Sequence, residues 1–176
     1  MKGDSIIRAL NVADTANQSP ISPPPCILLV DGDPVRRHAS AEVLIQHGYE
    51  VNAVEDAAAA LEELQAVHYH LLITDYDLPK INGVKLIKKL RAARITLPII
   101  MVAGQLPAEE LALHPTLQLA AALVKPVSME VLLDTVKIVL CATHSHQEHR
   151  AEQASAITHV LQSSLRHHSD SAHLEK

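Results

Sequence analysis

Four charged side chains follow three short apolar runs of the sequence, and together they are suited to phosphoryl transfer. Asp31 and Asp33 follow the first run, Asp75 follows the second, and Lys125 follows the third. In an open α/β sheet of parallel strands, ligands bind at the edge where the strands end. We therefore expect these carboxylates and this ammonium group to meet at one edge and to form a site that accepts a phosphoryl group.

The elements that must position these side chains are indicated by hydrophobic periodicity. Strands are expected at 26–30, 49–54, 70–74, 98–102 and 118–124, and helices at 34–47, 57–67, 83–93 and 107–114, with a last helix opened by Ser128. Nearly continuous apolar strands indicate a parallel sheet that is buried on both faces by helices. We therefore predict a doubly wound, flavodoxin-like α/β fold with strand order 2-1-3-4-5, in which the first and third strands are neighbours.

Individual residues predict where helices begin and end. Pro34 suits a first helical turn, Gly48 suits a helix end, and Asp56 suits an N-terminal cap. Pro115 disfavours helix continuation beyond about His114. The 83–93 helix is expected to place four apolar residues largely on one face: Val84, Leu86, Ile87 and Leu90. The last helix is expected to carry Val131, Leu132, Thr135, Val136 and Val139.

The composition excludes several classes of function. The chain of 176 residues has a net charge of −5, no Phe or Trp, and only three Tyr. Aromatic side chains on which bases could stack are scarce, and the sequence has no dense block of Lys and Arg. We therefore expect no nucleic-acid partner. The sequence also lacks G-x-x-x-x-G-K-[ST] and G-x-G-x-x-G loops, and with only five glycines a phosphate cradle is not expected. We therefore do not expect a nucleotide-dependent enzyme.

The location predicted from the sequence is the cytoplasm. Asp4 and Arg8 interrupt the apolar residues near the N-terminus, which is not typical of a signal peptide. No segment reaches the roughly 18 apolar residues of a membrane span. The two cysteines do not form a disulfide framework.

The chain is predicted to comprise one domain and two tails. Residues 1–25 are polar and proline-rich, which indicates a disordered or extended tail, and residues 26–141 form the domain. Residues 142–176 hold most of the histidines, and we expect one amphipathic helix there, packed on the domain or on a second copy as a homodimer. The tail histidines are expected to be solvated, and the tail is too short for a DNA-binding output domain of ordinary size.

Four motifs of the segment 26–140 resemble the receiver domain of bacterial two-component response regulators, in particular a single-domain, chemotaxis-regulator-like form. These motifs are L-L-V-D-G-D-P-V-R-R, L-L-I-T-D-Y-D-L-P-K-I-N-G, P-I-I-M-V-A-G and V-K-P-V. The resemblance implies a module that accepts a phosphoryl group from a sensor histidine kinase or a phosphotransfer protein and then acts on a downstream protein target.

The resemblance also implies a role for each candidate residue. Asp75 is the expected phosphoacceptor, and Lys125 is expected to pair with it. The family binds Mg²⁺ through acids after the first strand, the phosphoacceptor and a backbone carbonyl two residues beyond it. Here these ligands are Asp31, Asp33, Asp75 and the carbonyl of Asp77.

Three positions depart from the family pattern. Gly32 replaces the second of two adjacent acids, and Asp33 points elsewhere unless the loop shifts, so we expect weak Mg²⁺ binding. Ala103 replaces a hydroxyl residue that hydrogen-bonds the phosphoryl group, and such a bond is worth about 1.5–3 kcal/mol. Ala122 replaces an aromatic switch residue. Two hypotheses therefore stay open: a phosphorylatable receiver, and a degenerate pseudo-receiver that acts as a phosphorylation-independent interaction module.

Overall fold

The computed structural model describes residues 23–143 and 145, and the predicted tail structures over 1–22 and 146–176, including the proposed dimer helix, lie outside this range. The described residues form one five-stranded parallel sheet of order β2-β1-β3-β4-β5, as the sequence predicted. Its elements are β1 (Cys26–Val30), α1 (Pro34–Gln46), β2 (Glu50–Val54), α2 (Ala57–Ala66), β3 (Leu71–Asp75), α3 (Gly83–Ala92), β4 (Ile99–Ala103), α4 (Ala108–Leu113), a 3-10 turn (Pro115–Leu117) and β5 (Ala121–Val124). A C-terminal helix follows, beginning at residue 129.

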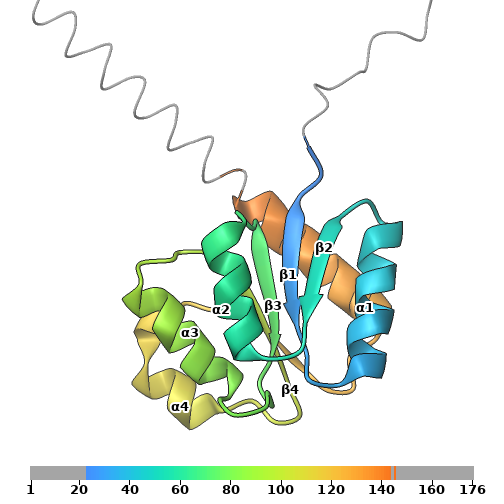
Figure 1. Ribbon diagram of the computed structural model, residues 1–176. Helices are drawn as coiled ribbons and strands as arrows, with labels where there is room; N and C mark the ends of the chain where they lie inside the picture. Colours follow the sequence, from blue (N-terminus) through green and yellow to red (C-terminus); the bar gives the residue numbers. More distant parts are fainter. Residues whose placement is uncertain (1–22, 144, 146–176) are drawn as a thin grey trace, which may run out of the picture.

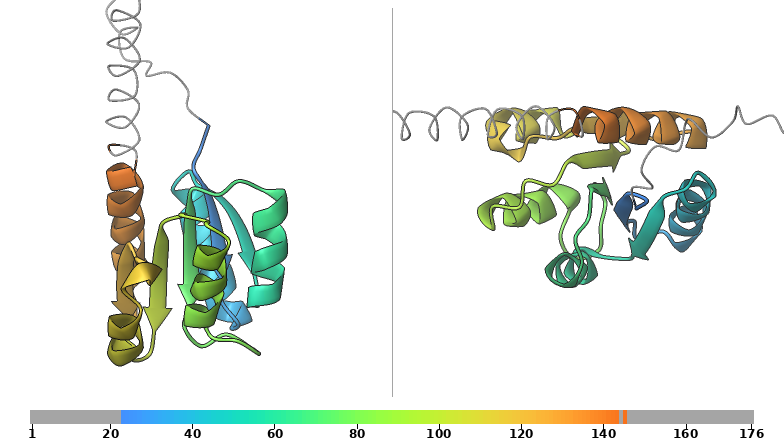
Figure 2. Two further views of the ribbon diagram at one scale, coloured as in Figure 1. Left: turned by 90° about the vertical axis from the view of Figure 1, so that its left-hand side faces the viewer. Right: turned by 90° about the horizontal axis from the view of Figure 1, so that it is seen from above.

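Helices cover both faces of the sheet (Figures 1 and 2). On one face, α1 and the C-terminal helix contribute Leu44, Leu132 and Val136 to an aliphatic core. On the other face, α2 and α3 pack their inner residues against alternate residues of the same strands. The inward face predicted for α3 is confirmed, because Val84, Leu86, Ile87 and Leu90 are fully buried. The sheet is therefore fixed from both sides, and its strand ends are held rigidly.

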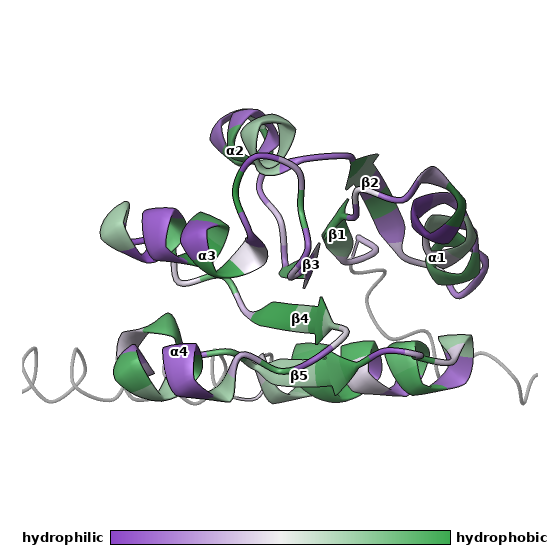
Figure 3. Cartoon of the chain, turned by 90° about the horizontal axis from the view of Figure 1, so that it is seen from below, coloured by the Kyte–Doolittle hydropathy of each residue, from purple (hydrophilic) through white to green (hydrophobic). Residues whose placement is uncertain are grey.

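The predicted burial of every strand on both faces is wrong for the two outermost strands. The central strands β1, β3 and β4 are almost entirely buried, whereas Glu50, Asn52 and Ala53 of β2 are exposed. In β5, burial alternates, and Val124 is 51% exposed. An outermost strand has a neighbour on one side only, so part of its surface reaches solvent. Figure 3, which views the edge where the strands end, shows β4 and β5 in green and the outermost strand β2 in a mixture of green and purple.

Four of the five predicted strands differ from the structure at their boundaries, three of them by one residue and the fifth strand by three. The third strand continues one residue further than predicted and includes Asp75. The fifth begins at residue 121 instead of 118, because Arg91 draws the preceding chain out of the sheet. Its guanidinium donates hydrogen bonds to the carbonyl groups of Leu117 and Gln118, and Gln118 adopts φ 46°.

The predicted helix ends are confirmed. Gly48 follows α1 with φ +86°, a conformation that glycine adopts freely. The Asp56 carboxylate caps α2 by accepting hydrogen bonds from the backbone N–H groups of Ala58 and Ala59. In the C-terminal helix, Leu132, Leu133, Val136 and Val139 are buried, whereas Val131 is 49% exposed. Within the described range, no helix combines the length and apolar character needed to span a bilayer.

Candidate functional site

Asp75 is the last residue of β3 and lies at the centre of the strand-end edge. The residue is only 2% exposed, although a carboxylate normally stays in water. Its Oδ1 atom accepts a hydrogen bond of 3.0 Å from the backbone N–H of Asp77. The absence of a side chain at Gly83 lets the chain pass close to the backbone of Asp75, because a Cβ at Gly83 would lie 2.5 Å from the Asp75 carbonyl oxygen. The local backbone therefore holds this carboxylate in one position.

Lys125 reaches Asp75 from the end of β5, across the intervening strand β4. Its backbone N–H donates to the Ala103 carbonyl at 2.8 Å, which fixes the residue beside the end of β4. Its Nζ atom lies 2.6 Å from Asp75 Oδ2, and the side chains of the two residues are 23% and 1% exposed. The predicted pairing of these residues is thus present as a short, largely buried ion pair.

Arg36 also binds Asp75, and sequence reasoning missed it. Its guanidinium donates from Nη2 to Asp75 Oδ2 at 3.1 Å and to Asp31 Oδ1 at 2.9 Å. Its Nε donates to Asp31 Oδ2 at 3.1 Å, and its Nη1 donates to Asp33 Oδ2 at 3.2 Å. The hydrogen bonds to Asp31 and the neighbouring carboxylate charges raise the pKa of this guanidinium above its usual value. The sequence signal that could have identified Arg36 was its place in the first turn of the helix that follows Asp31 and Asp33.

Asp31 and Asp33 have different roles in the loop after β1. Asp31 Oδ1 accepts the Asp33 backbone N–H at 2.8 Å, so the loop folds around this carboxylate. Asp33 turns away to cap α1, where its Oδ1 accepts the backbone N–H groups of Val35 and Arg36. These backbone hydrogen bonds, the one from Arg36 first, hold the pKa of the Asp33 carboxyl below its usual value. The expectation that Asp33 points elsewhere is therefore correct.

The predicted ligands of Mg²⁺ do not fit that ion in this arrangement. The carboxylates of Asp31 and Asp75 accept hydrogen bonds from Arg36, Asp33 serves as a helix cap, and Asp77 is exposed on the following loop. Among the residues the structure describes, no group of three or more His, Cys, Asp or Glu side chains is arranged to hold a metal ion. The charge of the carboxylates is instead matched by side chains of the protein.

The three positions that depart from the family pattern lie around this cluster. Ala103 ends β4 and is fully buried, so a methyl group faces the place where a hydroxyl is expected. Ala122 is an exposed residue of β5. A Cβ at Gly32 would lie 3.1 Å from the Pro79 side chain, so a larger residue there would press on the loop after β3.

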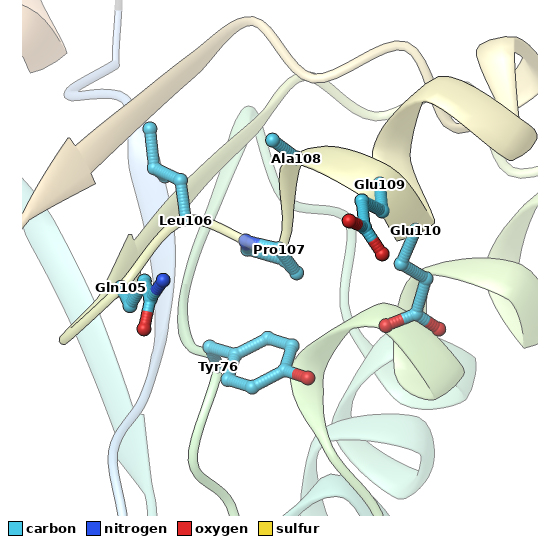
Figure 4. Close-up of a pocket in the computed structure, with 7 residues that line it drawn as sticks. All are labelled: Tyr76, Gln105, Leu106, Pro107, Ala108, Glu109 and Glu110. Carbon is cyan, nitrogen blue, oxygen red and sulfur yellow. The ribbon is translucent and has the colours of Figure 1, made fainter.

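A shallow pocket of about 590 Å³ lies next to the site, between the residue after Asp75 and the start of α4. Figure 4 shows the Tyr76 ring on one side and Pro107 on the other, with Gln105, Glu109 and Glu110 around them. The pocket lies on the side of the site where β4 ends. Any rearrangement of the loop that follows Ala103 would change its shape.

Comparison with known proteins identifies the family. The sequence model of the response regulator receiver domain matches residues 27–137, which is more than half of the chain. This chain belongs to the receiver domain family. The matched segment includes all five strands apart from Cys26, the first residue of β1, and all the charged residues of the site.

Curated relatives place similar receiver domains inside larger proteins. The chain is 30% identical over 112 residues to the sensor histidine kinase RcsC of Escherichia coli K12, covering 64% of this chain and 12% of the kinase. It is 31% identical over 129 residues to the sensor protein EvgS of E. coli O157:H7, covering 72% of this chain and 11% of that protein. It is 30% identical to the regulatory protein VirG of Agrobacterium tumefaciens, covering 65% of this chain and 43% of VirG.

Solved receiver structures share the fold. A CheY-like receiver from Methanospirillum hungatei superposes with a TM-score of 0.66 at 27% identity, covering 70% of this chain and 98% of that one. The chemotaxis response regulator CheY4 of Vibrio cholerae superposes with a TM-score of 0.60 at 27% identity, covering 66% of this chain and 98% of CheY4. This receiver domain thus belongs to two-component signalling.

Proposed function

We propose that this receiver domain accepts a phosphoryl group on Asp75 from a phosphohistidine of a sensor histidine kinase or a phosphotransfer protein. It then acts in the cytoplasm through contacts with a downstream protein, not as an enzyme with a substrate of its own. The observation that carries this proposal is the buried pair of Asp75 and Lys125, whose Oδ2 and Nζ atoms lie 2.6 Å apart. A buried carboxylate with a dedicated cation at a strand end is typical of a functional site.

The groups present can perform the transfer chemically. A carboxylate oxygen of Asp75 attacks phosphorus, so that an O–P bond forms while the N–P bond of the phosphohistidine breaks and its electron pair stays on the imidazole. Negative charge concentrates on the phosphoryl oxygens during this step. Lys125 and Arg36 both contact Asp75 Oδ2 and are therefore positioned to stabilise that charge.

The relatives support a kinase or phosphotransfer partner. Two of the curated relatives are a sensor histidine kinase and a sensor protein, and a third is a regulatory protein. Because the matched segments are small parts of those proteins, their remaining activities belong to them alone.

A second candidate function is a receiver whose protein contacts do not depend on phosphorylation. The buried methyl of Ala103 favours it, because this side chain cannot hydrogen-bond a phosphoryl oxygen. Shifting a two-state equilibrium from 1:99 to 99:1 takes about 5.5 kcal/mol, and the missing bond would supply about 1.5–3 kcal/mol of that. In this second candidate, Asp75 is seldom or never phosphorylated.

Mass spectrometry after incubation with acetyl phosphate separates the two candidates. We expect the intact protein to gain the mass of one phosphoryl group, and the Asp75→Asn variant to gain none. Asp134→Asn is the matched control, because this exposed acid lies on the C-terminal helix, outside the site, and should leave labelling unchanged. A folded wild-type protein that acquires no label would refute phosphoacceptor function and support the phosphorylation-independent module.

A further inference from the structure

We propose that the guanidinium of Arg36 is a built-in cation that takes the place of a divalent metal ion at Asp75, so that this receiver works without Mg²⁺ and does not bind it. The proposal concerns the charge balance of the site. It rests on the proposed function only in so far as it predicts how phosphoryl transfer responds to metal.

One side chain links all three carboxylates of the edge. The guanidinium makes a forked contact with both oxygens of Asp31, at 2.9 and 3.1 Å, and reaches Asp33 and Asp75 at 3.2 and 3.1 Å. An oxygen-ligated metal ion at this edge would have to compete with these same donors for the same lone pairs. Arginine can make such contacts because its five N–H groups lie in a fixed plane.

The fold brings this side chain to the edge by a short and well-defined path. Asp33 caps α1 and Pro34 is its first residue, so residue 36 lies in the first turn, whose side chains lie beside the strand ends. The adjacent Arg37 does not share the role, since its Nη1 donates to the backbone carbonyl of Asp31 at 2.6 Å. The position of Arg36 therefore follows from the helix cap.

The single positive charge of Arg36, in place of a doubly charged metal ion, suits a site that has one carboxylate fewer than the family pattern. The family's second acid, which ligates the metal, is Gly32 here, and its replacement removes one negative charge and two ligand oxygens. A side chain at this position would press on Pro79, since a Cβ there would lie 3.1 Å from the proline Cδ. A permanent single positive charge on Arg36 thus meets a site that has lost one carboxylate, whereas Mg²⁺ would bring a double charge and require more oxygen ligands.

The position of Arg36 also indicates how its side chain would bind a phosphoryl group. Its Nη2 atom already contacts a carboxylate oxygen of Asp75, and its side chain is 47% exposed. N–H donors on a charged group form strong, often bidentate hydrogen bonds to phosphoryl oxygens. Arg36 and Lys125 would then hold the phosphoryl group between two fixed cations.

Metal titration followed by thermal unfolding tests the proposal. We expect the melting temperature of the wild-type chain to be unchanged by millimolar MgCl₂ or MnCl₂ beyond the effect of matched NaCl. In Arg36→Asn, the oxygens of Asp31 and Asp75 become available, and we expect a saturable metal-dependent rise of about 3 °C or more. Lys85→Asn removes an exposed positive charge from the first turn of α3 and should respond like the wild type.

A saturable rise in the wild type as large as that in Arg36→Asn would overturn the proposal, and so would the absence of any metal response in a folded Arg36→Asn. If Arg36→Asn does not fold, Arg36→Gln, which keeps a longer polar side chain, replaces it in the same titration.

Acetyl phosphate labelling provides the second arm. Wild-type labelling should proceed at the same rate with Mg²⁺ and with a chelator, and a tenfold or greater loss in the chelator would contradict metal independence. If the wild type is not labelled under either condition, the proposed phosphoacceptor function fails, while the titration still decides whether Arg36 replaces the metal.

Discussion

Two neighbouring parts of the strand-end edge are built in opposite ways. The ends of β1, β3 and β5 carry a network in which Asp31, Asp75, Arg36 and Lys125 join through hydrogen bonds of 2.6–3.1 Å. The helix α4 that follows β4 is tied instead by an ion pair between Glu110 and Lys88 of α3, at 3.2 Å. Ala103 offers only a methyl, α4 has no side-chain cap, and none of its residues is buried.

This difference separates a densely hydrogen-bonded charged site from an adjacent region with fewer side-chain contacts. The network holds a buried carboxylate in place by three independent donors, from β5, from α1 and from its own loop. In α4, by contrast, no residue is buried, although Leu111 packs against the core, and exposed segments of this kind open at lower free energy than the core. The charged side chains of the site are thus tied by several hydrogen bonds, whereas the end of β4 offers only the methyl group of Ala103.

Removing the cation of β5 should have the largest effect. In Lys125→Met, we expect a loss of about 3 kcal/mol in the free energy of unfolding, the lower end of the range for breaking a buried ion pair, because Arg36 still contacts the same oxygen. Urea denaturation measures this. Lys85→Met, at an exposed position, should change stability by less than about 0.5 kcal/mol. A loss below about 1 kcal/mol for Lys125→Met would mean that the network does not depend on this pair.

A polar cluster at the other end of β3 should respond to alkaline pH. The Tyr69 hydroxyl donates to Glu63 Oε2 at 2.7 Å and accepts from Asn52 Nδ2 at 2.6 Å. Burial, and then the hydrogen bond to Glu63, raise the pKa of Tyr69 from 10.0 to about 12.

Between these two pH values the folded state binds more protons than the unfolded state, so stability falls as pH rises, by about 2–3 kcal/mol at most. The loss should be fully absent below pH 10 and should disappear in Tyr69→Phe. Denaturation curves collected across this pH range test it. An equal slope in the two proteins would show that Tyr69 contributes nothing.

Alanine substitutions at two glycines, Gly83 and Gly104, test the difference between the two parts of the edge directly. Gly83→Ala forces a Cβ to within 2.5 Å of the Asp75 carbonyl oxygen, whereas a Cβ at Gly104, after β4, meets nothing within 4 Å. We expect Gly83→Ala to lose about 2 kcal/mol by overpacking and Gly104→Ala to change stability by less than about 0.5 kcal/mol. Thermal unfolding of both variants checks this. Equal effects would remove the distinction between a rigid network and a loosely attached loop.

A hydroxyl group introduced at the end of β4 should allow this region to hydrogen-bond a phosphoryl analogue, and so should reduce the difference between the two parts of the edge. In Ala103→Ser, we expect beryllofluoride, a phosphoryl analogue, to bind about tenfold more tightly, which corresponds to a hydrogen bond of about 1.5 kcal/mol to a charged group. Isothermal titration calorimetry measures the affinity. Gly104→Ser, one residue further along, is the control and should bind as the wild type does. Unchanged affinity in Ala103→Ser would show that the hydroxyl does not reach the ligand.

Much of the fold was predictable because local signals agreed. The strand order followed from alternating apolar runs and right-handed crossovers, and the caps at Asp56 and Ser128 were correct to the residue. The exposure of β2 was not predicted, because a strand's place at the edge of the sheet depends on which strands surround it. The late start of β5 was also missed, because it depends on Arg91, which is distant in sequence.

The sequence alone determined which chemical groups the site contains. It placed a carboxylate or an ammonium group at the end of each of three strands, and it showed the losses at Gly32, Ala103 and Ala122. These are properties of single positions and short motifs, so one chain suffices to find them.

Only the tertiary structure decided how those groups are paired. It brought Lys125 to Asp75 across fifty positions, and it placed Arg36 among three aspartates at once. Such contacts depend on the packing of α1 and β5 around β3, because a hydrogen bond requires atoms to meet within about 3 Å and spacing along the chain does not specify that distance.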